Sequence, residues 1–85
     1  MRNFKAYPSP AADYITLPYS LKYGGDVSIV VFDEAGKTLG TFDSRNKPAG
    51  LNELKINVAD YAAGNYYFSI RSGNSSLVSE FSVVK

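Results

Sequence analysis

The stretch Gly-Asn-Tyr-Tyr-Phe-Ser-Ile-Arg, residues 64–71, is the most strand-like part of the chain. Tyr66, Phe68 and Ile70 fall on one face of an extended segment and alternate with more polar residues, which is the pattern of a half-buried β-strand. Tyr66 also opens this strand directly after a turn signal. We therefore expect a tyrosine corner, in which the Tyr66 hydroxyl donates to the backbone of the preceding turn, as it does in immunoglobulin-like sandwiches.

The same two-residue period recurs on both sides of this stretch. Strands are predicted over residues 4–7, 13–21, 27–33, 38–42, 51–58, 65–71 and 77–83, with turns or loops at 23–26, 33–37, 43–50, 59–64 and 72–74. No window has convincing helical periodicity. The pattern predicts an all-β fold, a single immunoglobulin-like antiparallel β-sandwich of about seven strands, and a small barrel is the alternative.

The alternation also predicts which side chains form the core. The inward rows are Ile15, Leu17, Tyr19 and Leu21; Leu54, Ile56 and Val58; Tyr66, Phe68 and Ile70; and Leu77, Phe81 and Val83. Residues 27–33 are apolar on both faces, as expected of a central strand. Pro18 cannot donate a ladder hydrogen bond, so its strand is expected to be an edge or to be bulged there. Gly36 is expected in the left-handed region of a hairpin turn.

Composition excludes several classes of function. The chain of 85 residues is long enough for one domain, and it contains no Cys and no His. Thiolate sites, imidazole metal sites and His-based proton transfer are therefore absent. Nine basic against eight acidic residues leave a net charge of +1, so there is no electrostatic signature of nucleic-acid binding. No apolar run reaches the roughly 18–20 residues of a membrane-spanning helix, and the first residues do not form a signal peptide.

The two candidate sites for chemistry are each better explained as turns between strands. Asp33 and Glu34 are adjacent carboxylates, but they sit in a tight turn without the other oxygen ligands of a calcium loop. Gly24, Gly25 and Asp26 resemble a phosphate loop but precede a strand rather than a helix. The prediction is a protein that is not an enzyme and has no catalytic residue, cofactor or metal site.

The chain is rich in aromatic residues, with seven Tyr and five Phe. Most of them fall on the predicted inward rows. Tyr23, Tyr61 and Tyr67 are the ones expected to be partly exposed, where they could contact a glycan or a peptide. Packing in the core or at its rim is the default interpretation.

Three pieces of the sequence together resemble the type A C-terminal sorting domain of the type IX (Por) secretion system of Bacteroidetes. They are Tyr7-Pro8-Ser9-Pro10-Ala11 with Asp13-Tyr14-Ile15, the apolar strand Val27–Asp33 with Gly36-Lys37, and the region from Gly50-Leu51-Asn52 through Gly64-Asn65-Tyr66 to Phe81-Ser82-Val83-Val84-Lys85. Ser9 and Glu80 depart from the residues usual in that family. The residues that carry the resemblance, as candidate sorting-motif residues, are Tyr7, Pro8, Pro10, Ala11, Gly36, Asn52, Gly64, Tyr66, Phe81, Val83 and Lys85.

The resemblance implies a secretion signal. It implies that residues 4–85 are the sorting domain, that residues 1–3 belong to a linker, and that a cargo domain precedes it in the same chain. It also implies passage through the periplasm, engagement by the outer-membrane translocon, removal by a sortase-like peptidase and attachment of the cargo to the cell surface. We expect Phe81, Val83 and Lys85 to carry much of the signal, through strand addition or capture of the terminal carboxylate.

The alternative function is an immunoglobulin-like or fibronectin type III-like accessory module of an extracellular enzyme. Such a module would space domains or bind glycans through Tyr61 and Tyr67. A weak homodimer is also expected, because short sandwiches have open edges.

Overall fold

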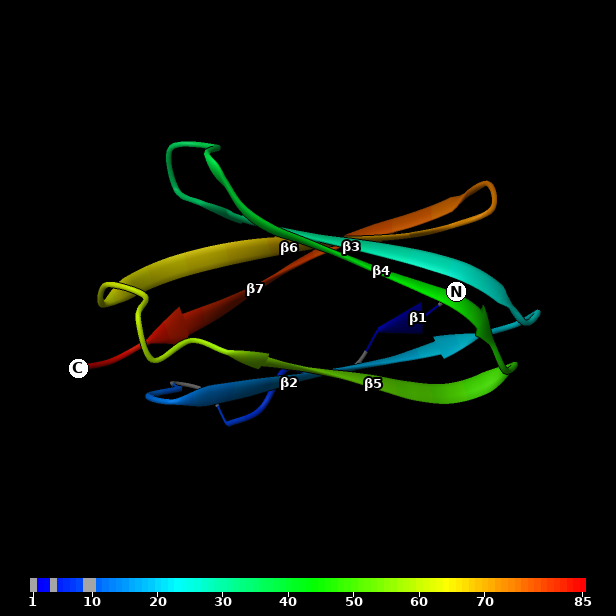
Figure 1. The fold of residues 1–85 in the computed structure, drawn as a ribbon, viewed down its shortest axis with the longest axis horizontal. Coiled ribbons are helices and arrows are strands. Elements are labelled where there is room, and N and C mark those ends of the chain that lie inside the picture. The colour runs from blue at the N-terminus through cyan, green and yellow to red at the C-terminus, as the bar shows by residue number, and fades with distance from the viewer. Residues whose placement is uncertain (1, 4, 9–10) are drawn as a thin grey trace.

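The computed structural model describes residues 2–3, 5–8 and 11–85, which form a twisted β-sandwich (Figure 1). The strands are β1 (Arg2–Asn3), β2 (Tyr14–Leu21), β3 (Gly25–Asp33), β4 (Thr38–Lys47), β5 (Gly50–Asn57), β6 (Gly64–Ser72) and β7 (Ser75–Val83). The described residues contain no helix.

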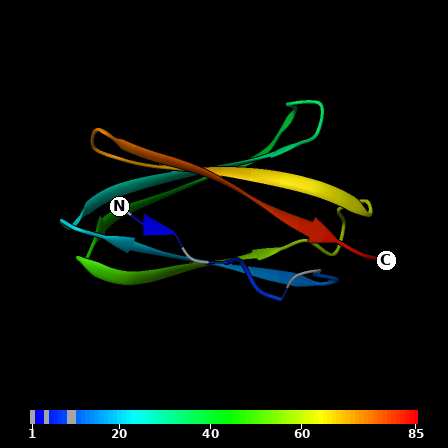
Figure 2. The same cartoon turned by 180° about the vertical axis from the view of Figure 1, so that it is seen from behind.

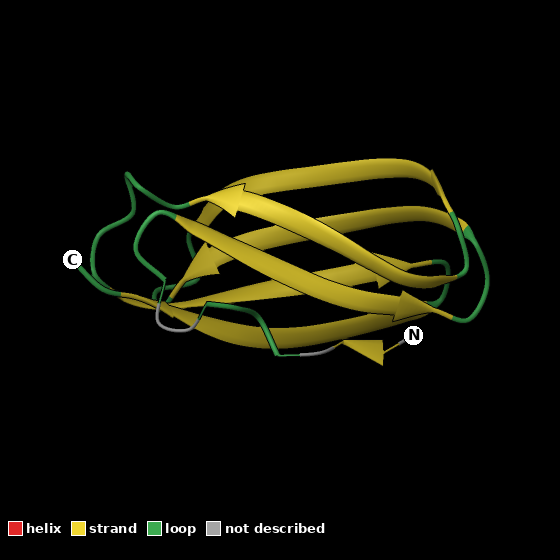
Figure 3. Ribbon diagram, turned by 90° about the horizontal axis from the view of Figure 1, so that it is seen from below, coloured by secondary structure: helices red, strands yellow, loops and turns green. Residues whose placement is uncertain are grey.

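Two antiparallel sheets make up the layers. One has the order β1-β2-β5 and the other the order β4-β3-β6-β7. The two layers face each other in Figure 1 and in the view from behind (Figure 2), and β1 and the C-terminal residues lie toward opposite ends of the long axis (Figure 3). The predicted immunoglobulin-like sandwich is therefore confirmed. It is built of six strands of eight to ten residues, and the seventh, β1, has two.

The core lies between the sheets and consists mainly of the predicted rows. Leu77 does not belong to it: it was predicted to face inward, but it is only half-buried. The buried hydrophobic residues are Ala6, Ala11, Ile15, Leu17, Tyr19, Leu21, Val27, Ile29, Val31, Ile56, Val58, Tyr66, Phe68, Ile70, Phe81 and Val83. Leu54 is only partly buried and packs against this cluster. β3 is central, as predicted, because it pairs with both β4 and β6.

The first strand lies elsewhere than predicted. Of the expected strand at residues 4–7, Phe4 lies outside the described residues, and Tyr7 forms a single antiparallel bridge with Thr16. Arg2 and Asn3, expected to be linker, pair instead with Ser20 and Tyr19.

Pro18 explains why this pairing is interrupted. The Thr16 amide and carbonyl both bond to Tyr7, so the backbone of Pro18, two residues on, faces the same side and has no N–H to offer. The register also shifts by one residue between the Asn3–Tyr19 pair and the Tyr7–Thr16 bridge. The prediction for this strand is therefore wrong: β2 is the middle strand of its sheet, and it stays in continuous register with β5 through Pro18. The irregularity lies instead in the segment that pairs with the other side of β2.

β4 is longer than predicted. Residues 43–50 were expected to be a polar loop, but the strand continues to Lys47 and only Pro48 and Ala49 separate it from β5. The polar residues are compatible with a strand because β4 is an edge strand with mostly exposed side chains. Asp26 supports the end of β4, since its Oδ1 accepts the Asn46 amide at 3.0 Å.

The hairpin between β3 and β4 forms as predicted. The Gly36 amide donates to the Asp33 carbonyl at 3.0 Å, and Gly36 has φ of 85°, a left-handed conformation that favours glycine. The Asp33 carboxylate accepts the amides of Ala35 and Lys37, each at 2.9 Å. This acidic residue therefore closes the turn.

A leucine-to-alanine substitution is expected to have different effects on stability at buried and at exposed positions of the sandwich. Leu17 is fully buried, whereas Leu51 is 64% exposed. Leu17→Ala is expected to lower the free energy of unfolding by about 2–5 kcal/mol, because it removes buried methyl groups and leaves a cavity. Leu51→Ala, the matched control, is expected to change it by less than about 0.5 kcal/mol. Urea denaturation measures both, and equal effects would contradict the assignment of faces.

Candidate functional site

The segment Tyr7–Ala11 passes the chain from one sheet to the other. Tyr7 exchanges two backbone hydrogen bonds with Thr16 of β2, at 3.0 and 2.7 Å. Ala11 then bonds to β7, where its amide donates to the Ser82 carbonyl and its carbonyl accepts the Val84 amide, both at 2.9 Å. The Tyr7–Pro8 peptide is cis, and Pro10 lies outside the described residues. This entry segment therefore ties both layers together.

Ala11 occupies the most confined position of this segment. It has no exposed surface and belongs to the hydrophobic core. A larger side chain would have to displace its neighbours at a close-packed site. The small residue after the two prolines thus has a packing reason.

Lys85 anchors the end of the described chain to the same region. Its Nζ donates to the carbonyl oxygens of Ala12 at 3.1 Å, Val58 at 3.3 Å and Ala59 at 2.5 Å. Ala12 precedes β2, whereas Val58 and Ala59 follow β5, so the ammonium bridges the two segments that adjoin these strands. The side chain expected to face a receptor is therefore turned back onto the domain, and Val84 beside it is half exposed.

Phe81 and Val83 face the core rather than solvent. The Phe81 ring stacks on Tyr66 at 5.6 Å and lies 6.2 Å from Phe68. Their direct effect is to fix the position of the final residues of β7.

Tyr66 forms the predicted tyrosine corner. Its hydroxyl donates to the Ala62 carbonyl, and its ring lies 5.2 Å from that of Tyr61. Burial raises the pKa of the Tyr61 hydroxyl, and the neighbouring Tyr66 raises it further. Gly64, just before the strand, has φ of 153°, which a residue with a side chain rarely adopts. The corner therefore fixes the Ala59–Ala63 loop beside the Lys85 anchor.

Asn52 lies at the opposite end of the sandwich. It is the one buried polar side chain among the described residues, and its amide donates to the carbonyls of Pro48 and Gly50 at 2.9 and 3.2 Å. It thus closes the short connection between β4 and β5. The resemblance marked Asn52 without a role, and this hydrogen bonding supplies a structural one.

The three tyrosines proposed as aromatic contacts do not form one surface. Tyr23 is 75% exposed in the β2–β3 turn, whereas Tyr61 is half buried near the C-terminal end. Tyr67 is half buried on the outer face of the four-stranded sheet, where it stacks on Phe32 at 5.7 Å. Their partial exposure is as predicted, but a shared platform for a glycan is not present among them.

Two exposed tyrosines were missed. Tyr7 and Tyr14 are each about half exposed on the three-stranded sheet, where the Tyr7 hydroxyl donates to Glu53 at 3.4 Å and Lys55 lies 4.5 Å from the Tyr14 ring centre. The alternation around Ile15 contains the signal for Tyr14, because it places Tyr14 on the face opposite Ile15.

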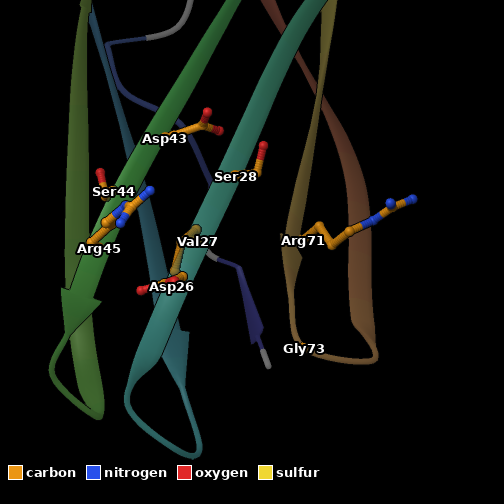
Figure 4. Close-up of a pocket in the computed structure, with 8 residues that line it drawn as sticks. All are labelled: Asp26, Val27, Ser28, Asp43, Ser44, Arg45, Arg71 and Gly73. Carbon is orange, nitrogen blue, oxygen red and sulfur yellow. The ribbon is translucent and has the colours of Figure 1, made fainter.

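Shallow hollows lie at both ends of the molecule. One, of about 280 Å³, is lined by Asp33–Ala35 and Ala63–Tyr66, near the tyrosine corner. Another, of about 330 Å³, lies on the outer face of the four-stranded sheet among Asp26–Ser28, Asp43–Arg45, Arg71 and Gly73 (Figure 4). Among the residues that the structure describes, no group of three or more acidic residues could hold a metal ion.

The geometry defines the class of protein: an immunoglobulin-like sandwich whose last strand and tail are held by the entry segment and by Lys85. The family model for the secretion system C-terminal sorting domain matches residues 5–85. The chain therefore belongs to the family of type IX secretion C-terminal sorting domains. Comparison with curated proteins gives no match. None of the described segments forms a helix long and apolar enough to cross a membrane.

Membership in this family establishes the general role of the chain. The chain is a type IX sorting signal, which directs secretion across the outer membrane to the cell surface or the exterior. Such a signal implies interaction with the type IX machinery and with a cargo-bearing chain.

The tyrosine corner gives a testable prediction. Tyr66→Phe keeps the ring in the core but removes the donor to Ala62, so unfolding is expected to become easier by about 1 kcal/mol. Tyr23→Phe, at an exposed ring, is the control and is expected to change stability by less than about 0.5 kcal/mol. Thermal unfolding followed by circular dichroism compares them, and an unchanged midpoint for Tyr66→Phe would contradict the role of its hydroxyl.

Proposed function

We propose that the translocon recognises the folded C-terminal end of this sandwich, centred on Val84 and Lys85. The observation that supports this most is the convergence of residues from the family resemblance at one end. Ala11 holds the Val84 amide, Lys85 bonds to the loop after β5, and Tyr66 anchors the same loop. These contacts give the tail one defined position.

The exposed groups of this end are the ones a receptor contacts. Because Phe81 and Val83 are buried, they contribute by placing the tail, and the half-exposed Val84 presents an apolar side chain beside it. A preorganised tail is bound at a lower cost in conformational entropy than a disordered one. The hollow between Glu34 and Gly64 lies near this end and is available to a second contact.

The steps of secretion follow from this role. Cargo attached ahead of the domain crosses the inner membrane by a separate signal, and the domain folds in the periplasm. The translocon then engages the folded end. A sortase-like peptidase cleaves ahead of the domain that residues 4–85 form, and the cargo is joined to surface lipopolysaccharide.

The domain takes no catalytic part in these steps. The absence of Cys and His from the sequence removes the commonest nucleophile–base pairs. The Asp33 carboxylate closes a turn, the Asp26 carboxylate accepts a backbone amide, and the Lys85 ammonium bonds to carbonyls. These groups have structural partners.

A reporter fusion tests the proposal. A reporter with an inner-membrane signal is placed ahead of the 85-residue chain in a host with a type IX system, and the reporter outside the cell is measured. Deletion of Val84 and Lys85 is expected to reduce external reporter to background, with the reporter retained in the periplasm. Leu51→Ser is the control, because Leu51 is also an exposed apolar residue but lies at the opposite end of the sandwich; this variant is expected to be secreted normally.

A second variant separates recognition from folding. Val84→Ser retains the backbone bond to Ala11 and is expected to fold as the parent does but to be secreted less. Circular dichroism of the purified chains checks the fold. Normal secretion of both the deletion and Val84→Ser would overturn the proposal.

A further inference from the structure

The outer edge of β7 has an unpaired stretch. The Ser82 carbonyl and the Val84 amide point away from β6, toward Ala11. Because backbone groups of alternate residues point to the same edge of a strand, those of Ser76, Val78 and Glu80 also point away from β6. Among the described residues, β7 pairs only with β6 and, at Val83, with Ala11. Within the stretch Ser76–Glu80, the amides and carbonyls of Ser76, Val78 and Glu80 are therefore left without a strand partner.

This edge is the least protected in the molecule. Bulges, charged residues and prolines usually prevent exposed edges from pairing. β4, the other edge of the same sheet, has two register irregularities, and β5 carries Glu53 and Lys55. In contrast, β7 is in continuous register with β6 from Ser75 to Val83. It has no proline or lysine, Glu80 is its one charged residue, and Val78 is 68% exposed.

We propose that β7 pairs antiparallel with β7 of a second copy of this chain, about a two-fold axis at Val78. In that register Val78 lies opposite Val78 of the other copy, and Ser76 lies opposite Glu80 in both directions. All these residues have outward-facing backbone groups, so every pair can exchange ladder hydrogen bonds. The edge is self-complementary, as a closed two-fold interface requires.

The side chains suit this register as well. The two Val78 side chains form a β-branched cross-strand pair, and no like charges are placed opposite each other. Such a pair would also shield an apolar side chain that is exposed in the single copy. Ser76 offers a hydroxyl to the Glu80 carboxylate of the other copy.

Arg71 provides charge complementarity. It lies opposite Ser76 in the β6–β7 register. Its side chain extends from β6 across β7, away from the hollow in Figure 4 and toward the open edge. In the paired form, Glu80 of the second copy follows Ser76 in the same row, about 10 Å from Arg71 between backbones. An arginine and a glutamate side chain together span that separation, and symmetry forms the contact twice.

The interface is small, so the dimer is expected to be weak. A few cross-strand pairs place it at the low end of protein interfaces, with a dissociation constant on the order of 0.1 mM. This association differs from recognition of the Val84–Lys85 tail, because the paired stretch ends before Phe81. The entry segment at Ala11 limits its length.

Sedimentation analysis of the 85-residue chain between about 10 µM and 1 mM tests the proposal across the expected range. The wild-type chain is expected to dimerise as concentration rises. Val78→Lys is expected to remain monomeric, because two lysines would meet at the axis. Leu39→Lys, the same type of change on the β4 edge, is the control and is expected to dimerise as the wild type does.

Charge reversal tests the register. Arg71→Glu and Glu80→Arg are each expected to weaken dimerisation about tenfold, and the double variant is expected to restore it. Val78→Pro removes only an outward-facing amide and is a second way to block the edge.

A wild-type chain that stays monomeric, or a dimer unaffected by both Val78 substitutions, would overturn the proposal. The proposal would also be overturned if the wild-type chain is monomeric and the Val78→Lys variant is not secreted. That result would assign the β7 edge to pairing with a strand of another protein.

Discussion

The backbone of Ala11 holds the two sheets together where β7 ends. Its amide and carbonyl bond to Ser82 and Val84, and four residues earlier Tyr7 is bonded to β2 in the other sheet. Only a small side chain fits, because Ala11 is completely buried. With this crossing in place, the tail lies over the end of the three-stranded sheet, and Lys85 reaches the carbonyls of Val58 and Ala59.

This constraint explains why most of the residues that carry the family resemblance serve to hold the fold together. Tyr66, Phe81 and Val83 are core residues, and Asn52 closes a sheet-to-sheet connection. A sorting signal is contacted by other proteins, so its information lies in the arrangement of its exposed backbone and side chains. The buried residues define that arrangement, and the exposed residues around Val84 are free to contact a partner.

The sequence predicted what depends on local pattern. The inward rows around Leu17 and Phe68 follow from a two-residue period, and the Tyr66 corner follows from its position after a turn. The extension of β4 was missed because edge strands need no apolar alternation. The hydrogen bonds of Lys85 were missed because its carbonyl partners lie in segments far away in the sequence. Contacts of that kind are set by tertiary geometry.

Amide hydrogen exchange of Ala11 and Val84 tests the central claim most directly. If the entry segment holds the tail, these two amides exchange as slowly as those of Ile29 and Phe68 in the central strands, because they open only when the domain unfolds. Fast exchange at Ala11 and Val84, with the central strands still protected, would contradict the account. The tail would then be loosely attached and could not present a fixed surface.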